Sequence, residues 1–396
     1  MPRPRPPAAR AGSGTARAAA TMGTVALATT ALAVVAACRP DVRRPPRPSF
    51  APVPGPAVEG ALMTTSSPAL ADLDGDGVQD LVFGTGVDRV RPGPGRMIFT
   101  GAPEVSGEVV AVSGRTNRVL WQVPNPRDAF TTPRLVRLNG DAVPDVVMGG
   151  REGVLTAFDG RTGQVLWRVT GDAIAATPWP YGFYTPALVA DRTGDGVPEL
   201  VASYGGNDMK AAKEARDPGW LALLSGADGR VLARAELPDS GETYASPVVY
   251  RREDGSEWLV VGTGGETHGG AEWRAPVAAL ADGTLGARLE RLVEPGRKGV
   301  IAPPTVVDLT GDGEPDLVVS AFDGRLLALD GATGKPLWRR VDADEEAYHQ
   351  PAVLRLDARG ARLGLVVSRG IGAFPKYVGS VHRVLDARDG TVLWEY

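Results

Sequence analysis

The residues best suited to chemistry lie in one nine-residue stretch, DLDGDGVQD, which begins at Asp72. Its carboxylates, Asp72, Asp74, Asp76 and Asp80, alternate with other residues, and two glycines stand among them. Alternate acidic side chains in a tight turn can converge on one point, and glycine lets the backbone turn there. Such a cage suits a hard cation with about six to eight oxygen ligands, and we expect Ca²⁺. The apolar run LVF follows, so the stretch predicts a loop that leads into a strand.

The acidic stretch recurs twice, as DRTGDGVPE at Asp191–Glu199 and as DLTGDGEPD at Asp308–Asp316. A further version, RLNGDAVPD, begins with an arginine, and Arg137 would supply the positive charge itself. The stretches at 251–259 and 355–363 have lost most of their acids. We therefore expect about three structural calcium ions and no catalytic water. The alternative is a solvated acidic turn, although four carboxylates packed without a cation would repel one another strongly.

These stretches belong to six repeated units, each of which begins with a proline before an apolar strand, at positions 68, 133, 186, 247, 304 and 351. A later strand of each unit runs into a turn, as in LTAFDGRTG at 155–163. The fourth strand carries Leu-Trp in four units, at Trp121, Trp167, Trp338 and Trp394. The third and fourth units have Val231–Ala233 and Leu285–Ala287 in its place.

Four short antiparallel strands per unit, repeated six times, predict an all-β protein, a β-propeller of about six four-stranded blades. A seventh blade around Val87–Thr100 is the alternative. One four-stranded sheet cannot bury both of its faces alone, so the sheets must pack on their neighbours, and a closed ring leaves few exposed edges. The recurring tryptophan would cover the adjacent blade and donate its indole N–H to the neighbouring turn.

Two known families resemble this pattern over residues 64–396. The acidic loops resemble the FG-GAP/VCBS repeats of integrin-α-type propellers, and segments such as ALDGATGKPLW at 328–338 resemble the PQQ-like, quinoprotein-type repeat. The first resemblance implies calcium ligands at loop positions one, three, five and nine, with the carbonyl of position seven. Carried onto this chain, the ligands are Asp72, Asp74, Asp76, Val78 and Asp80, then Asp191, Thr193, Asp195, Val197 and Glu199, and then Asp308, Thr310, Asp312, Glu314 and Asp316. The two threonines offer a hydroxyl in place of a carboxylate, which predicts weaker sites.

The amino-terminal segment, residues 1–37, has four arginines and no acid, and it ends in the uncharged apolar run Met22–Ala37. This order of basic, apolar and small residues predicts a secretion signal. The sequence VAAC at 35–38 resembles the bacterial lipoprotein signal, which implies that Cys38 is lipidated and holds the protein on a membrane. An ordinary signal peptide or an uncleaved anchor is the alternative. Residues 38–63 are rich in proline and predict an extended tether, with the propeller at 64–396.

The loops that precede the first strand of each unit carry aromatic residues, Phe130, Tyr184, Tyr244 and Tyr348, and His349 follows the last of them. Because strand direction alternates, these leading loops should lie on the face opposite the acidic loops. The connections between second and third strands share that face and are long at 203–219, 262–274 and 368–379. Long loops on a rigid scaffold often bind ligands, so we expect a binding site there. The alternative is that the aromatic residues only pack the end of the central channel.

The net charge and the cysteine content argue against some classes of function. The formal net charge is −4, and removal of residues 1–37 leaves −8, which argues against a nucleic-acid partner. Cys38 is the single cysteine, so no disulfide forms within the chain. We expect a non-enzymatic, calcium-stabilised, lipid-anchored propeller of the bacterial cell envelope that binds a protein or glycan, in a layout that resembles outer-membrane assembly lipoproteins. The alternatives are a carbohydrate-active lyase or hydrolase, with Glu242 and Glu266 as candidate groups, and a quinoprotein dehydrogenase, although such enzymes commonly show adjacent cysteines.

Overall fold

The structure is a computed structural model, and it describes residues 66–86, 90–93, 96–99, 107–125, 128–151, 153–175, 181–207, 210, 214–239, 241–357 and 362–396. All of them belong to one compact unit, Gly55–Tyr396. The predicted signal at 1–37, the lipidation site Cys38 and the tether at 38–63 lie outside the described residues. In the described part of the chain, no helix is both long and apolar enough to cross a membrane.

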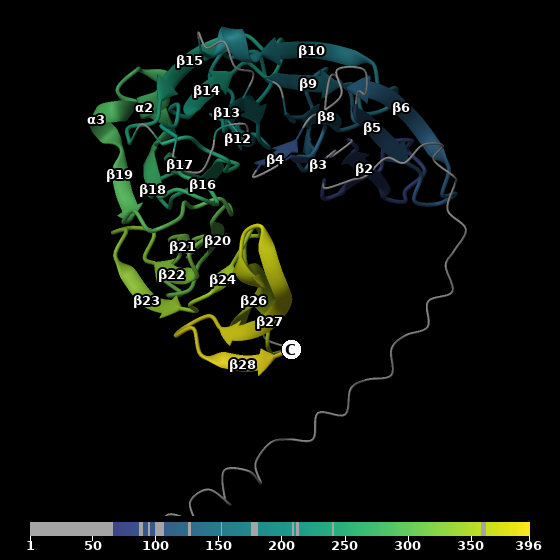
Figure 1. The fold of residues 1–396 in the computed structure, drawn as a ribbon. Helices are drawn as coiled ribbons and strands as arrows, with labels where there is room; N and C mark the ends of the chain where they lie inside the picture. The colour runs from purple at the N-terminus through teal and green to yellow at the C-terminus, as the bar shows by residue number, and fades with distance from the viewer. Residues whose placement is uncertain are drawn as a thin grey trace, which may run out of the picture. The chain divides into compact units, whose positions relative to one another are not determined.

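Six antiparallel sheets follow one another in chain order (Figure 1). The first sheet contains β1 (Ala69–Ala71), β2 (Asp80–Gly84), β5 (Gly107–Val112) and β6 (Val119–Asn125). The second contains β7 (Arg134–Val136), β8 (Asp145–Met148), β9 (Val154–Phe158) and β10 (Val165–Thr170). The third contains β11 (Gly182–Phe183), β12 (Ala187–Val189), β13 (Glu199–Gly205), β14 (Trp220–Leu224) and β15 (Val231–Glu236).

The last three sheets repeat the plan. The fourth contains β16 (Val248–Arg251), β17 (Glu257–Gly262), β18 (Glu272–Pro276) and β19 (Glu290–Val293). The fifth contains β20 (Thr305–Val307), β21 (Asp316–Ser320), β22 (Arg325–Leu329) and β23 (Pro336–Val341). The sixth contains β24 (Glu345–Glu346), β25 (Ala352–Arg355), β26 (Leu363–Ala373), β27 (Lys376–Asp386) and β28 (Val392–Glu395). The predicted all-β class and the six sheets are confirmed, with a short extra strand, β11 or β24, in the third and sixth sheets.

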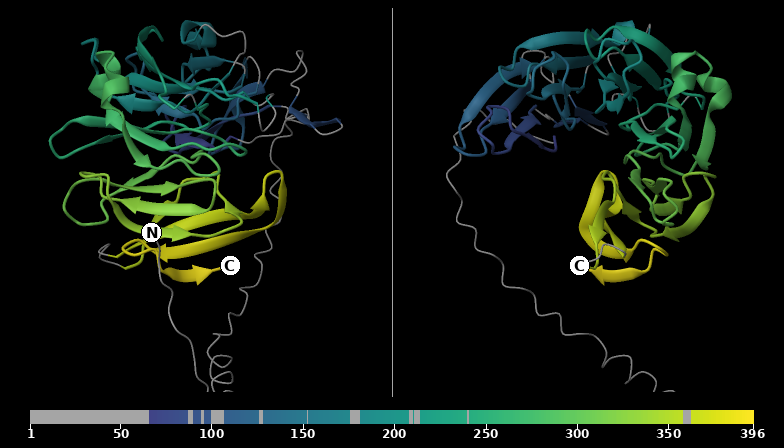
Figure 2. Two further views of the ribbon diagram at one scale, coloured as in Figure 1. Left: turned by 60° about the vertical axis from the view of Figure 1, so that its left-hand side comes forward. Right: turned by 180° about the vertical axis from the view of Figure 1, so that it is seen from behind.

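One alternative is not borne out, and two details of the prediction are wrong. Residues 90–93 and 96–99 form only a two-stranded sheet, β3 (Val90–Gly93) and β4 (Arg96–Phe99), so the described residues contain no seventh four-stranded sheet. Leu285–Ala287 belongs to helix α3 (Leu285–Arg288), and the fourth strand of that unit comes later, at β19. The segment 368–379 is no loop, because β26 and β27 extend through it as a long hairpin, drawn in yellow (Figure 2).

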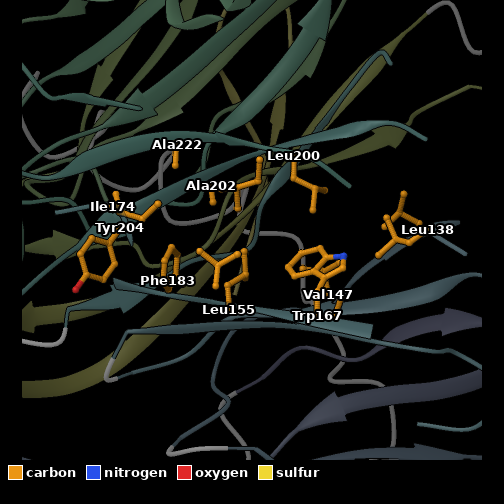
Figure 3. Packing of buried hydrophobic residues seen from close by; sticks show 14 of the residues in the cluster. Leu138, Val147, Leu155, Trp167, Ile174, Phe183, Leu200, Ala202, Tyr204 and Ala222 are labelled. Carbon is orange, nitrogen blue, oxygen red and sulfur yellow. The ribbon is translucent and has the colours of Figure 1, made fainter. Parts of the chain in front are cut away.

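The core lies between neighbouring sheets. Between the second and third sheets it contains Val147, Leu155, Leu200 and Tyr204, each at most 1% exposed (Figure 3). Both faces of the middle strands are covered, so every residue of β8 and of β13 is buried. Full burial of one such large apolar side chain stabilises the fold by about 1.5–3 kcal/mol. The sheets therefore depend on one another, because a single sheet on its own would leave both of these faces in water.

A tryptophan on the outer strand joins each of three sheets to the next sheet, as predicted. Trp121 Nε1 donates to the Gly160 carbonyl at 2.8 Å, Trp167 Nε1 to Gly226 at 2.8 Å, and Trp338 Nε1 to Ala387 at 2.9 Å. The receiving turn ends in a glycine such as Gly163, whose φ is +74°, and a Cβ there would lie 2.9 Å from the Trp121 ring. The glycine of the repeated Thr-Gly is thus explained, because the turn packs directly against an indole ring and leaves no room for a side chain.

The two units without Leu-Trp use other joints. Helix α2 (Val277–Ala281) and helix α3 of the fourth unit contact β15 of the third sheet, and their buried residues Val277, Leu280 and Leu285 fill the space there. In the fourth sheet, Arg274 takes the role of the indole, because its Nη1 donates to the Gly331 carbonyl at 2.7 Å. Three consecutive pairs of sheets are therefore joined by a tryptophan, one pair by helices α2 and α3, and one pair by Arg274.

Candidate functional site

The first acidic loop brings three carboxylates together. One oxygen each from Asp72, Asp74 and Asp80 lies within 4.8 Å of the others, a spacing that fits a shared cation. Gly75 and Gly77 have φ of +81° and +82°, which the tight turn requires. Asp76 does not join this group, because its Oδ2 accepts from Arg115 Nε at 2.6 Å. Hydrogen bonds from the Val78 N–H and from Arg115 lower the pKa of Asp76.

The ninth position of these loops has a structural role that does not need a cation. Asp80, Asp145 and Asp316 are at most 1% exposed. Asp80 accepts from the N–H of Leu73 at 2.7 Å and from that of Gly114 at 3.0 Å, so it ties its own loop to the turn between third and fourth strands. Asp145 and Asp316 repeat this arrangement with the N–H groups of Gly160 and Gly331. Burial raises the pKa of Asp145, and the N–H donors of Leu138, Gly160 and Asn139 oppose that shift.

The first aspartates of the third and fifth loops accept backbone N–H bonds, as Asp72 does from Gly75 and Gly77. Asp191 accepts from the N–H groups of Gly194 and Gly196 at 2.7 and 2.8 Å, and these bonds lower its pKa. Asp308 accepts from Gly311 and Gly313 in the same way. Glu199 accepts from its own loop, at the N–H groups of Arg192 and Thr193. Among the described residues, no three acidic groups converge in these two loops as they do in the first. The remaining predicted positions there, Thr193, Asp195, Val197, Thr310, Asp312 and Glu314, stay predictions.

The opposite ends of the strands carry the aromatic residues. Phe130 and Tyr184 meet edge to face with ring centroids 5.8 Å apart, and Tyr184 and Tyr244 meet at 6.4 Å. One aromatic row therefore runs across the leading loops of the second, third and fourth units. Tyr184 is only 6% exposed and packs within this row, whereas His349 is exposed on the leading loop of the sixth unit.

A second group links the fourth and sixth units through hydrogen bonds. The Tyr348 hydroxyl donates to Glu266 Oε1 at 3.1 Å, and the Tyr377 hydroxyl donates to Glu346 Oε2 at 2.6 Å. The two phenol oxygens are 3.3 Å apart. Glu346 is 4% exposed and also pairs with Lys298, which lies over the Phe322 ring. We call the surface made by the aromatic row and this group the mouth face.

Two tyrosines of the mouth face have exposed rings, while hydrogen bonds hold their hydroxyl groups in place. Tyr348 and Tyr377 are each 39% exposed, and the Tyr348 ring also packs edge to face on Phe322 at 4.7 Å. Burial of the hydroxyl end and the nearby Glu266 raise the pKa of Tyr348, so the phenol stays protonated at neutral pH. Each phenol uses its hydrogen on a carboxylate and keeps its oxygen lone pairs as acceptors. The arrangement can therefore accept hydrogen bonds from a ligand, but its tyrosines cannot act as bases.

Glu242 and Glu266 have different surroundings. Glu242 is 1% exposed, accepts from the Asn207 N–H at 2.9 Å and lies 3.1 Å from both Arg216 Nη1 and His268 Nε2. Burial raises the pKa of Glu242 against the opposing effects of Asn207 and Arg216. Burial, with Arg216, lowers the pKa of His268 to about 4, so its imidazole is neutral at pH 7. Glu242 is enclosed, whereas Glu266 reaches the mouth face through Tyr348.

The sequence did not point to Tyr377, Glu346 or Lys298. The sequence offered one clue to Tyr377, the unusual length of the segment 368–379. We interpreted this segment as a loop, whereas it forms the end of the hairpin of β26 and β27. Glu346 and Lys298 are single charged residues near strand ends, and no spacing in the sequence distinguishes them from solvated surface residues.

Comparison with known proteins supports a propeller with PQQ-like repeats. Residues 60–243, less than half of the chain, match the family model described as outer membrane protein assembly factor BamB. A search of the curated protein sequences finds no match. BamB from Moraxella catarrhalis is 14% identical with a TM-score of 0.42, over 73% of this chain and 67% of that chain.

Two solved enzymes are also similar in fold. The quinohemoprotein alcohol dehydrogenase ADHIIG from Pseudomonas putida HK5 gives a TM-score of 0.53 at 14% identity, over 85% of this chain and 60% of that chain. The enzyme from Comamonas testosteroni gives 0.53 at 11% identity, over 84% and 60%. This chain therefore spans about 60% of the length of either dehydrogenase. At such low identity the likeness shows the β-propeller fold alone.

Proposed function

We propose that this protein is a non-enzymatic, lipid-anchored propeller of the bacterial cell envelope that binds a partner protein or glycan through its mouth face. The hydrogen-bonded pair of Tyr348 and Tyr377 carries this proposal. Both rings are exposed, yet both hydroxyls are fixed by carboxylates, one from the fourth unit and one from the sixth. Side chains that are rigid before binding lose little entropy on binding, and tyrosine is enriched where proteins contact one another.

The net charge of the protein and its match to a family model give further support to a partner-binding role. The body after residue 37 has a net charge of −8, so electrostatics favour a partner without strong negative charge. The family matched by residues 60–243 is described as an outer membrane assembly factor, which is consistent with a protein partner in the envelope. The lipoprotein-like sequence that ends at Cys38 would hold the propeller at the membrane where such a partner lies.

We also propose that calcium binds the first acidic loop more tightly than the third or fifth. Asp72, Asp74 and Asp80 converge there, whereas no three acidic groups of the described third or fifth loop lie close enough together to share an ion. The ion would supply positive charge between carboxylates that otherwise repel one another. Its role would be structural, since the loop lies at the opposite strand ends from the mouth face.

The proposal is tested by quantitative affinity capture from detergent-solubilised envelope membranes. The bait is the full chain, compared with a Tyr348→Ala/Tyr377→Ala variant and with a Leu393→Ala/Trp394→Ala control. Leu393 and Trp394 are 42% and 47% exposed on β28, outside the mouth face, so the control removes similar apolar area. We expect at least one partner that the control retains and the mouth-face variant loses by about tenfold or more. Equal recovery by both variants contradicts the assignment of this face.

Two enzyme alternatives have direct assays. A quinoprotein would reduce an electron-accepting dye after addition of pyrroloquinoline quinone and calcium to the purified chain. A glycan lyase or hydrolase would release unsaturated or reducing ends from envelope polysaccharides, and Glu266→Gln would abolish that release. We expect neither activity, and either one would replace the binding proposal with an enzymatic function.

A further inference from the structure

The innermost strands line an open cavity of about 380 Å³. Its walls come from the second to fifth sheets and from the loop before β25, and they include Arg134, Leu188, Pro247, Pro304, Val306 and Gln350. Five successive units thus contribute to one cavity, which is large enough for a small ligand. None of the residues in its wall belongs to the mouth-face network.

Arg134 is the charged group of this wall. Its Nε donates to the Pro186 carbonyl at 2.7 Å, and this bond fixes one edge of the guanidinium against the third unit. Among the described residues, no acid forms an ion pair with Arg134, and burial alone lowers the pKa of its guanidinium. An arginine remains protonated even so. The wall therefore contains a partly desolvated positive charge whose two Nη groups have no anionic partner in the described structure.

The backbone around the cavity adds further donors. Strands β7, β16 and β20 stand at the ends of their sheets, and β12 pairs only with β13. Each of these strands leaves one edge with unpaired N–H and C=O groups. Inward-facing N–H groups of such edges can donate to an oxyanion, as they do where backbone amides surround phosphate. A planar guanidinium beside them matches the two oxygens of a carboxylate or phosphate.

We propose that this cavity binds a small oxyanion, a phosphate or a carboxylate, through the Arg134 guanidinium and the free edges of the innermost strands. The ligand supplies a counter-charge to Arg134, with which no described acid forms an ion pair. Because the site is independent of the mouth face, it would be occupied with or without the envelope partner.

Isothermal titration of the full chain in detergent, at constant ionic strength in chloride, tests this proposal. The probes are inorganic phosphate and citrate, in separate titrations, so that the two chemical sources are distinguished. We expect one saturable site per chain for at least one probe. Arg134→Gln should weaken it at least tenfold, and Arg134→Lys, which keeps the charge without the planar fork, should weaken it less. Arg137→Gln is the matched control, because Arg137 is exposed on the same unit and does not line the cavity. This variant should bind the anion with the affinity of the wild type.

A second variant separates binding from folding. Arg134→Gln also loses the bond to the Pro186 carbonyl, so its melting temperature must be measured beside its affinity. Leu188→Glu keeps that bond and places an acid in the cavity, since Leu188 is 36% exposed and lines it. This acid should neutralise Arg134 and abolish anion binding. Absence of saturable binding of both probes to the wild type, or wild-type affinity in Leu188→Glu, overturns the proposal.

Discussion

Glu272 gives the fold a dependence on pH that one substitution should remove. It begins β18, where it pairs with Gly262 on one side and Val293 on the other. The residue is 0% exposed, and neither of its carboxyl oxygens has a hydrogen-bond partner among the residues that the structure describes. Burial without a counter-charge raises its pKa well above the ordinary 4.5. The folded protein therefore holds Glu272 in the neutral, protonated form.

The sign of the pH effect follows from proton linkage. Above pH 4.5 the unfolded chain loses the Glu272 proton, while the folded protein keeps it up to its raised pKa. The folded state then binds one proton more than the unfolded state, so stability falls as pH rises through this window. The slope for one proton is at most about 1.4 kcal/mol per pH unit. Stability from this group is fully present below pH 4.5 and is progressively lost above it.

Glu272→Met replaces the acid by an apolar side chain of similar length. Removal of a buried polar group without partners should stabilise the protein by about 1–3 kcal/mol, and more as pH rises. Urea unfolding at intervals from about pH 5 to pH 8 measures the free energy at each pH. Glu236→Met, at an exposed position on β15, is the control and should stay within about 0.5 kcal/mol of the wild type. A variant with the wild-type pH slope, or one less stable than the wild type at pH 8, refutes this reasoning.

Three other substitutions test the remaining parts of the account. Asp72→Asn should abolish the rise in melting temperature that calcium gives over chelator in the wild type, and a persisting rise would assign the ion elsewhere. Trp121→Phe leaves the buried Gly160 carbonyl without its donor and should cost about 1–3 kcal/mol in urea unfolding, whereas Trp394→Phe on exposed β28 should cost under about 0.5 kcal/mol. Cys38→Ser should move the protein from the membrane to the soluble fraction after cell lysis, and unchanged membrane attachment would contradict lipidation.

Much of the fold could be predicted because each repeat contains the residues that connect its sheet to the next one. Trp121, Trp167 and Trp338 recur at one place in the unit, and the structure puts each indole on the turn of the next sheet. The helices α2 and α3 were missed because they fill the place of the third unit's missing tryptophan from the neighbouring unit. The replacement of a tryptophan by helices of the next unit depends on contacts between units, and a sequence pattern within one unit cannot reveal it.

The candidate sites were predicted less completely. Local spacing predicted the convergence of Asp72, Asp74 and Asp80, but it also included Asp76, which pairs with Arg115 instead. By contrast, the partnership of Tyr348 with Glu266 joins residues 82 positions apart, and that of Tyr377 with Glu346 crosses a hairpin whose register was unknown. Arg134 is distinguished by its place in the wall of a cavity that other units help to form, which the sequence cannot show.

The most direct test of the central claim, that the mouth face binds an envelope partner, is site-specific photocrosslinking in intact cells. A photoreactive amino acid at Val378, which is 85% exposed beside Tyr377 on β27, should give a discrete crosslinked product. The same probe at Asp389, exposed beyond the other end of that strand, should give none. A product at Asp389 with none at Val378 would contradict the account.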